Sequence, residues 1–283
     1  APDANVYPEI PHISFDDAEA IAATAGQTLV TTAPEADTAS FNITYGDGWT
    51  GITNCNYAGD INVQLTGTTE HTVFGSMGSG QAGNLTLEIA AGGEAGNGTY
   101  SGQTAAIAGS YNNGSAAEFN VFVNGGTVQG DIVGGAVHGS GTVESVTLVV
   151  NSGTVQGDLL GGSKTTGTVK NAGITVNGGI INGDIVAGGS AGTVGNTSVV
   201  VNGGVIAGSI TKGDATRSEG ARATVTVVGN KAYIGGCIKA DDVTLRNVSA
   251  SGYADGFDAY AGKIIAEKLT LDNVQVDLKA KLS

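Results

Sequence analysis

The chain has 283 residues, 48 of them glycine and four proline, with a formal net charge of −14 at pH 7. Glycine is more than twice as frequent as in an average protein, and charged residues, at 13%, are about half as frequent. The scarcity of proline excludes a collagen-like chain, and 40% hydrophobic residues exclude a disordered one. Residues 1–163 contain no Lys or Arg. Such an acidic surface repels phosphates and anionic lipids, and every long uncharged stretch is interrupted by Gly, Asn and Ser, so we expect neither nucleic acid binding nor membrane insertion.

Residues 1–40 are expected to form an N-terminal segment with its own short helix. Ser14–Asp17 has the pattern of a helix capping box, Ala18–Ala25 follows with mostly small residues, and Gly26 is a typical end signal. Terminal coils of repeat proteins need a polar cover. The helix is therefore predicted to cap a repeat domain formed by residues 41–283.

A repeated motif dominates the middle of the chain. Close variants of Val-Asn-Gly-Gly-x-Val-x-Gly-Asp-Ile begin at Val123, Val150, Val176 and Val201. Pairs of apolar residues with one residue between them extend the repeat to nine copies, most of them about 26 residues apart. These pairs are Val63/Leu65, Leu87/Ile89, Val121/Val123, Leu148/Val150, Ile174/Val176, Val199/Val201, Val225/Val227, Val243/Leu245 and Leu269/Leu271.

Alternation with a period of two indicates strands, and units this short cannot bury their apolar side alone. Stacking them buries all inward residues in one column, with glycine at the corners between short strands. The sequence therefore predicts an all-β fold, a single-stranded parallel β-helix of about nine coils. Two insertions, Gly92–Ala117 and Lys212–Arg222, are expected to leave the regular coil as loops.

Asp131, Asp158 and Asp184 occupy equivalent positions of the repeat, and Ser209 follows in the next copy. Stacked in register, the three carboxylates would lie ~4.8 Å apart along one edge. Carboxylate oxygens are ligands for Ca²⁺, which gives one hypothesis, a calcium site. The other hypothesis is a set of turn aspartates that hydrogen-bond their own backbone. No other cofactor is expected, and scattered His and Cys residues argue against zinc.

Two further rows follow from the same register. The first contains Asn124, Asn151, Asn177 and Asn202, whose amides are expected to bond one another along the axis. The second is the outward position of the alternating strand, which is suited either to strand formation alone or to binding a glycan or ice surface. It reads Gln64, Glu88, Phe122, Val149, Thr175, Val200, Thr226, Thr244 and Thr270.

Asp255-Gly-Phe-Asp258 is similar to one acidic motif of β-helical polygalacturonases, in which paired carboxylates act as acid and base. Asp255 and Asp258 are thus the catalytic candidates of an alternative hypothesis, a carbohydrate-active β-helix enzyme of hydrolase or lyase type. The accompanying Gly-His-Gly and Arg-x-Lys elements are missing after this match. We therefore expect a chain without catalysis.

Cys55 and Cys237 would lie about seven coils apart, or ~34 Å at strand spacing, so both are predicted to be free thiols.

The repeated Val-Asn-Gly-Gly copies resemble the Gly-rich solenoids of bacterial surface proteins, such as autotransporter passenger domains and large adhesins. The resemblance concerns residues 60–280. It implies an extracellular or cell-surface scaffold or adhesin, with a glycan or protein surface as partner. The oligomeric state stays open.

Overall fold

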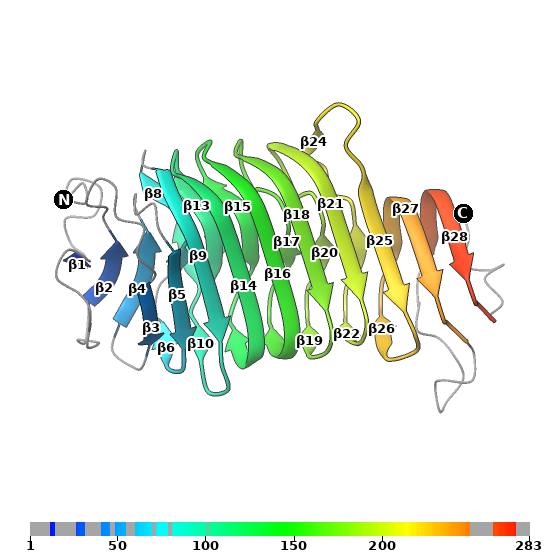
Figure 1. Cartoon of the computed structure of the whole chain (residues 1–283), viewed down its shortest axis with the longest axis horizontal. Coiled ribbons are helices and arrows are strands. Elements are labelled where there is room, and N and C mark those ends of the chain that lie inside the picture. The colour runs from blue at the N-terminus through cyan, green and yellow to red at the C-terminus, as the bar shows by residue number, and fades with distance from the viewer. Residues whose placement is uncertain are drawn as a thin grey trace.

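The computed structural model describes residues 12–14, 27–31, 41–45, 49–54, 60–69, 72–78, 81–100, 102–249 and 263–275. Within these residues the chain is a parallel β-solenoid of about seven turns with a period near 26 residues, which confirms the predicted fold class. One 26-stranded sheet winds through the molecule, and its paired strands run parallel. Figure 1 shows the coils stacked side by side between the two chain ends.

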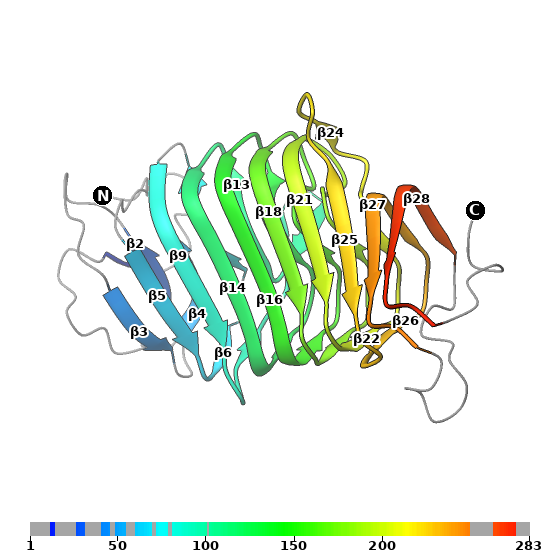
Figure 2. The same cartoon turned by 45° about the vertical axis from the view of Figure 1, so that its right-hand side comes forward.

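Three faces make up each coil. Face 1 carries the long strands, which lie next to one another in both Figure 1 and Figure 2. Its strands are β3 (Phe41–Tyr45), β5 (Asp60–Leu65), β9 (Gln81–Ile89), the first parts of β14 (Ser115–Val128) and β16 (Thr142–Val155), β18 (Thr168–Val176), β21 (Thr193–Val201), β25 (Ala223–Val228), and the later parts of β27 (Ile238–Arg246) and β28 (Ile264–Asp272).

Faces 2 and 3 are built from shorter strands. Face 2 contains β6 (Thr68–Thr69), β10 (Glu94–Ala95), the ends of β14 and β16, β19 (Ile180–Ile181), β22 (Gly204–Ile206) and β26 (Ala232–Ile234). Face 3 contains β4 (Trp49–Asn54), β7 (Val73–Phe74), β13 (Ile107–Asn112), β15 (Ile132–His138), β17 (Leu159–Leu160), β20 (Ile185–Val186), β23 (Ile210–Thr211) and the first residues of β27 and β28.

The remaining strands extend this pattern or leave it. β1 (His12–Ser14) pairs with β2 (Gln27–Thr31), which pairs with β4. β8 (Met77–Gly78) pairs with β13, and β24 (Thr216–Arg217) pairs with β21. The expectation that all of Gly92–Ala117 leaves the coil as a loop is wrong, because β10, β13 and the start of β14 pair with neighbouring coils. Only the antiparallel hairpin of β11 (Gly98–Tyr100) and β12 (Gln103–Ala105) in this segment lies outside the main sheet. The loop around β24 protrudes from the stack in Figure 1.

Besides the segment Gly92–Ala117, the number of coils differs from the sequence-based expectation. The nine apolar pairs do stack in one continuous register along face 1, but a coil is complete only where face 2 has a strand as well, which gives about seven turns where about nine were expected. The predicted capping helix falls on residues 15–25, which lie outside the described residues. Ser14, the expected first residue of the capping box, ends strand β1.

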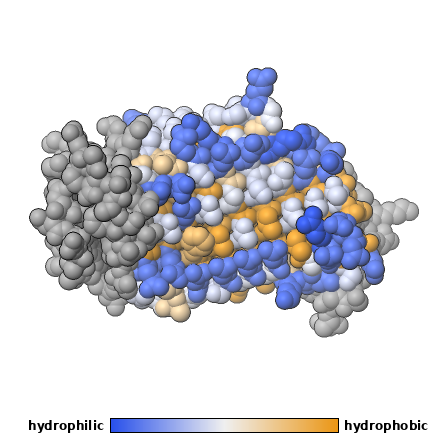
Figure 3. All heavy atoms as spheres, in the orientation of Figure 1, coloured by the Kyte–Doolittle hydropathy of each residue, from blue (hydrophilic) through white to orange (hydrophobic). Residues whose placement is uncertain are grey.

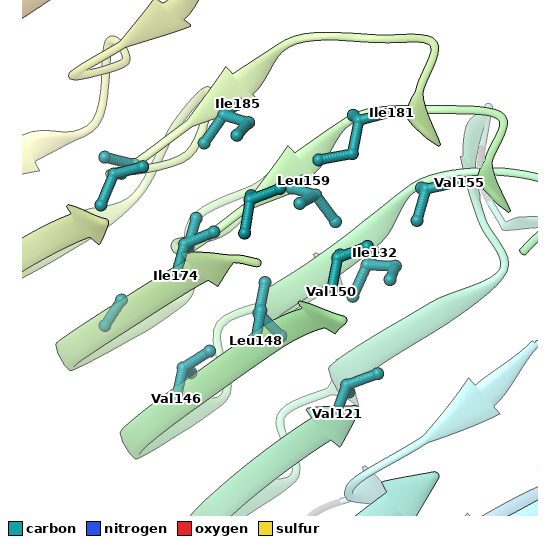
Figure 4. Packing of buried hydrophobic residues seen from close by; sticks show 14 of the residues in the cluster. Val121, Ile132, Val146, Leu148, Val150, Val155, Leu159, Ile174, Ile181 and Ile185 are labelled. Carbon is teal, nitrogen blue, oxygen red and sulfur yellow. The ribbon is translucent and has the colours of Figure 1, made fainter. Parts of the chain in front are cut away.

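The inward side chains fill the interior with branched apolar residues. Val121, Leu148 and Ile174 follow one another in register, and each exposes only 1% of its surface. Ile132, Val155 and Leu159 reach the same core from the other two faces (Figure 4). Burying each such side chain contributes about 1.5–3 kcal/mol relative to leaving it in water, and the resulting rigid rod holds the outward residues in fixed rows.

Candidate functional site

The aspartate row forms a continuous ladder of hydrogen bonds between coils. Oδ1 of Asp131 accepts a hydrogen bond from the backbone N–H of Asp158, Asp158 accepts one from Asp184, and Asp184 accepts one from Ser209, each at 2.7 Å. The Ser209 hydroxyl continues the series by accepting from the N–H of Cys237 at 3.0 Å. The expectation that each aspartate bonds its own backbone is therefore wrong, because the next coil supplies the donor.

The glycine before each aspartate makes room for this ladder. A Cβ on Gly157, Gly183 or Gly208 would lie 2.1 Å from the Oδ1 atom of the aspartate one coil earlier. Such a distance is far inside van der Waals contact, so only glycine fits. The Gly-Asp dipeptide is thus one structural unit. The glycine leaves room for the carboxylate of the preceding coil, and the aspartate accepts a hydrogen bond from the backbone of the following coil.

The ladder places like charges close together. Burial raises the pKa of Asp158 most strongly, the hydrogen bond from the Asp184 N–H opposes this, and the carboxylates of Asp131 and Asp184 raise it further. Lys164 forms an ion pair with Asp131 and also donates to the carbonyl oxygen of Thr104 at 2.6 Å.

Calcium binding to these aspartates stays a prediction. Among the described residues, no group of three or more His, Cys, Asp or Glu side chains is arranged to hold a metal ion. One oxygen of each aspartate in the ladder already accepts a backbone N–H.

The asparagine ladder is confirmed. The side-chain amide of Asn151 donates to Asn124 at 2.8 Å, Asn177 donates to Asn151 at 2.7 Å, and Asn202 donates to Asn177 at 2.8 Å. Asn124 in turn donates to Glu88 at 2.8 Å. These amides satisfy one another, which indicates a structural role.

The outward row of face 1 lies in register as predicted, from Gln64 to Thr270. Figure 3 shows an apolar band along the rod on this side, with hydrophilic side chains above and below it. Phe122, Val149 and Val200 contribute apolar side chains to the row and are half-buried. From Phe122 to Thr270 the row is therefore a stripe of apolar and hydroxyl side chains, and Gln64 and Glu88 precede it.

A shallow groove of about 410 Å³ runs beside this stripe across β16, β18, β21 and β25. The sequence reasoning missed it. Gly173 was a visible signal, because the same position of the neighbouring coils holds Thr147 and Ser198. The groove is lined by Ser145, Val146, Thr147, Asn171, Ala172, Gly173, Asn196, Thr197, Ser198, Arg222 and Thr224.

Arg222 is the charged residue of the groove lining, and its guanidinium group is engaged by carboxylates. Its Nε and Nη2 atoms donate to the two oxygens of Asp242 at 2.6 and 3.1 Å, and Nη2 also donates to Glu267 at 3.0 Å. These hydrogen bonds raise the pKa of Arg222 and lower the pKa of Asp242. The positive charge at this end of the groove is therefore balanced by two carboxylates.

An ion cluster around the buried carboxylate of Asp241 lies where the segment Lys212–Arg222 leaves the coil. The carboxylate of Asp241, 7% exposed, accepts from Lys212 Nζ and from the Ala223 N–H, each at 2.7 Å, and Arg217 Nε lies 3.8 Å away. Burial favours the neutral acid, but these partners outweigh it and lower the pKa of Asp241. Arg217 pairs in register with the buried Val194 of the preceding coil, so this position, apolar in that coil, holds a charged residue of the cluster.

The catalytic candidates of the alternative hypothesis, Asp255 and Asp258, lie outside the described residues, and so does Cys55. Cys237 is a free thiol, as predicted. Within the described part of the chain, no helix is long and apolar enough to cross a membrane.

No protein-family model matches this chain, and comparisons with curated proteins and with solved structures give no match. Its function is therefore inferred from its own side chains.

Proposed function

We propose that this chain is a non-catalytic scaffold, secreted or displayed at a cell surface, that presents face 1 to a glycan or protein surface. The observation that carries the proposal is the outward row from Gln64 to Thr270, which keeps its register over successive coils. A rigid flat surface with a contiguous apolar band is typical of an interaction site. The resemblance of the Gly-rich repeats to bacterial surface solenoids also supports it.

The carboxylates of face 1 favour binding over catalysis. Glycoside hydrolysis needs two carboxyl groups that face each other across the sugar bond and exchange protons with it. Glu88 instead accepts hydrogen bonds from Gln64 at 3.0 Å and Asn124 at 2.8 Å, and Asp242 is held by Arg222. Carboxylates fixed in this way stabilise the face and are poorly suited to proton transfer.

A retention assay tests the proposal. Beads coated with the protein are passed over arrays of glycans and extracellular matrix proteins, and the same glycans are assayed for new reducing ends. We expect retention without cleavage. Val149→Asp should reduce retention because it puts a charge into the apolar band of face 1.

Val205→Asp is the control for the choice of face, because Val205 is 41% exposed on face 2, in register with the exposed Ile180 and Tyr233. Its retention should equal that of the unmodified protein. Cleavage of any glycan would overturn the proposal, and so would equal retention of the two variants or retention on neither array.

A further inference from the structure

Gly173 stands at the centre of the groove on face 1, in a strand where the fold does not require glycine. A Cβ built on it would have its nearest neighbour, the carbonyl oxygen of Val146, 4.0 Å away. By contrast, a Cβ on Gly195 in the next coil would lie 2.0 Å from a backbone oxygen. The φ angle of Gly173 is not in the left-handed region, and β18 keeps regular register with both neighbours at this point.

Glycine inside a strand weakens it and, where no bulge or bend explains it, marks a place where another molecule approaches the backbone closely. The three other coils that line the groove hold Thr147, Ser198 and Thr224 at the same outward position, and any of these side chains at 173 would fill the middle of the groove. The space above Gly173 is therefore open for a ligand.

The side chains around this space leave hydrogen-bonding capacity unused. Within the described residues, the side chains of Ser145, Thr147, Asn171 and Ser198 have no hydrogen-bond partner in the protein. Asn171 and Asn196 are partners in register, but the hydrogen bond of Asn196 goes to another residue, since its oxygen accepts from the Arg222 N–H at 3.0 Å. The amides of the asparagine ladder, a few residues further along the same strands, all bond one another.

The chemistry of the groove selects the class of ligand. Its free groups are uncharged hydroxyls and amides, and its one cation is balanced by Asp242 and Glu267, so an anionic ligand would gain little. The backbone of β18 is paired on both sides, which leaves no strand edge for a peptide. The groove crosses four coils, or ~14 Å at strand spacing, beside the apolar side chains of Val149 and Val200.

We propose that this groove binds a neutral linear oligosaccharide that lies along the rod axis, with Gly173 providing clearance and Asn171 donating to sugar hydroxyls. The apolar stripe contacts the faces of the sugar rings. This inference rests on the proposed function and adds the ligand class and the residues that recognise it.

The test is a calorimetric titration of the full chain. One set of ligands is neutral linear oligosaccharides of two to six sugars, and the other is uronate-containing oligosaccharides of equal length. Gly173→Thr should abolish binding while Tm stays equal or rises, because Thr favours strands and continues the row of Thr147. Ala207→Thr, which adds a similar side chain at an exposed site after β22, should change neither.

A second pair of variants separates binding from folding. Asn171→Ala should weaken the Kd roughly tenfold, as expected for one lost hydrogen bond, and leave Tm unchanged. Asn177→Ala breaks the structural ladder, so it should lower Tm and leave the Kd unchanged.

Neutral sugars that bind Gly173→Thr as tightly as the unmodified chain would overturn this inference. Binding of uronates only, or of no oligosaccharide, would overturn it as well. The bead assay separates this inference from the proposed function. If Val149→Asp loses retention on the beads while the titrations give any of these overturning results, the proposed function stands and only the groove is refuted as its site.

Discussion

The carboxylate of Asp158 offers a direct test of the ladder between coils. Its Oδ1 accepts the N–H of Asp184 at 2.7 Å in a half-buried position. A hydrogen bond to a charged acceptor contributes about 1.5–3 kcal/mol, and a donor left without an acceptor costs about 1–3 kcal/mol. Asp158→Ala is therefore expected to lower the free energy of unfolding by about 2 kcal/mol.

Asp158→Asn separates the acceptor from the charge. The pKa of Asp158 is raised in the folded chain, chiefly by burial, so the folded chain binds the proton more readily than the unfolded chain does. The unmodified protein therefore loses stability as pH rises from the unfolded value of 3.8 through the higher folded pKa. Asparagine keeps an oxygen for Asp184 and carries no charge, so this variant should be at least as stable as the unmodified protein at pH 7.

Urea unfolding followed by circular dichroism between pH 4 and 8 measures both effects. The difference between Asp158→Asn and the unmodified chain should shrink as pH falls, whereas Asp158→Ala should be less stable throughout. If Asn and Ala at this position cost the same, the side-chain oxygen is not what joins the coils. If Ala costs nothing, the ladder contributes no stability.

Three other substitutions probe the same rod by urea unfolding. Gly183→Ala should cost about 1–3 kcal/mol, because its Cβ would lie 2.1 Å from Asp158 Oδ1, and an unchanged midpoint would contradict the fit described for the Gly-Asp unit. Asp241→Asn should cost about 2 kcal/mol, because Lys212 and the more buried Arg217 lose their charged acceptor. Since the pKa of Asp241 is lowered on folding, the unmodified chain should lose the stability that this carboxylate contributes as pH falls below 3.8. If Asp241→Asn loses stability in acid to the same extent, Asp241 is not the group responsible. Ile174→Ala should cost about 2–5 kcal/mol, since Ile174 is 1% exposed in the core, and a smaller loss would mean that the coils collapse around the cavity.

The solenoid could be predicted because its register is repeated in the residues themselves. A one-residue slip would turn Leu148 and Val150 outward, so their alternation fixes which residues face the core. The row of asparagines from Asn124 to Asn202 followed from the same register. Both features depend on equal spacing along the chain, which the sequence displays directly.

Features that depend on atoms reaching between coils could not be predicted in the same way. Equivalent spacing placed Asp131 and Asp158 in one row but did not say that the carboxylate of one bonds the amide of the other. The glycine before each aspartate held that information, because it stands where a Cβ would collide. The cluster of Asp241 with Lys212 and Arg217 was missed because an irregular insertion, which breaks the period, brings these residues together.

The ladders also make the length of the rod adjustable in whole steps. Every ladder contact joins one coil only to the next, as in a one-dimensional crystal, so no contact specifies how many coils there must be. Excising residues 151–176 would make Asn177 the ladder partner of Asn124 and Asp184 the ladder partner of Asp131. The new partners are of the same residue types as the present ones, and the aspartate ladder would lose only the ion pair with Lys164. Sequence gain or loss in units near 26 residues would thus change the reach of the molecule and the number of outward groups it presents, without a new interface.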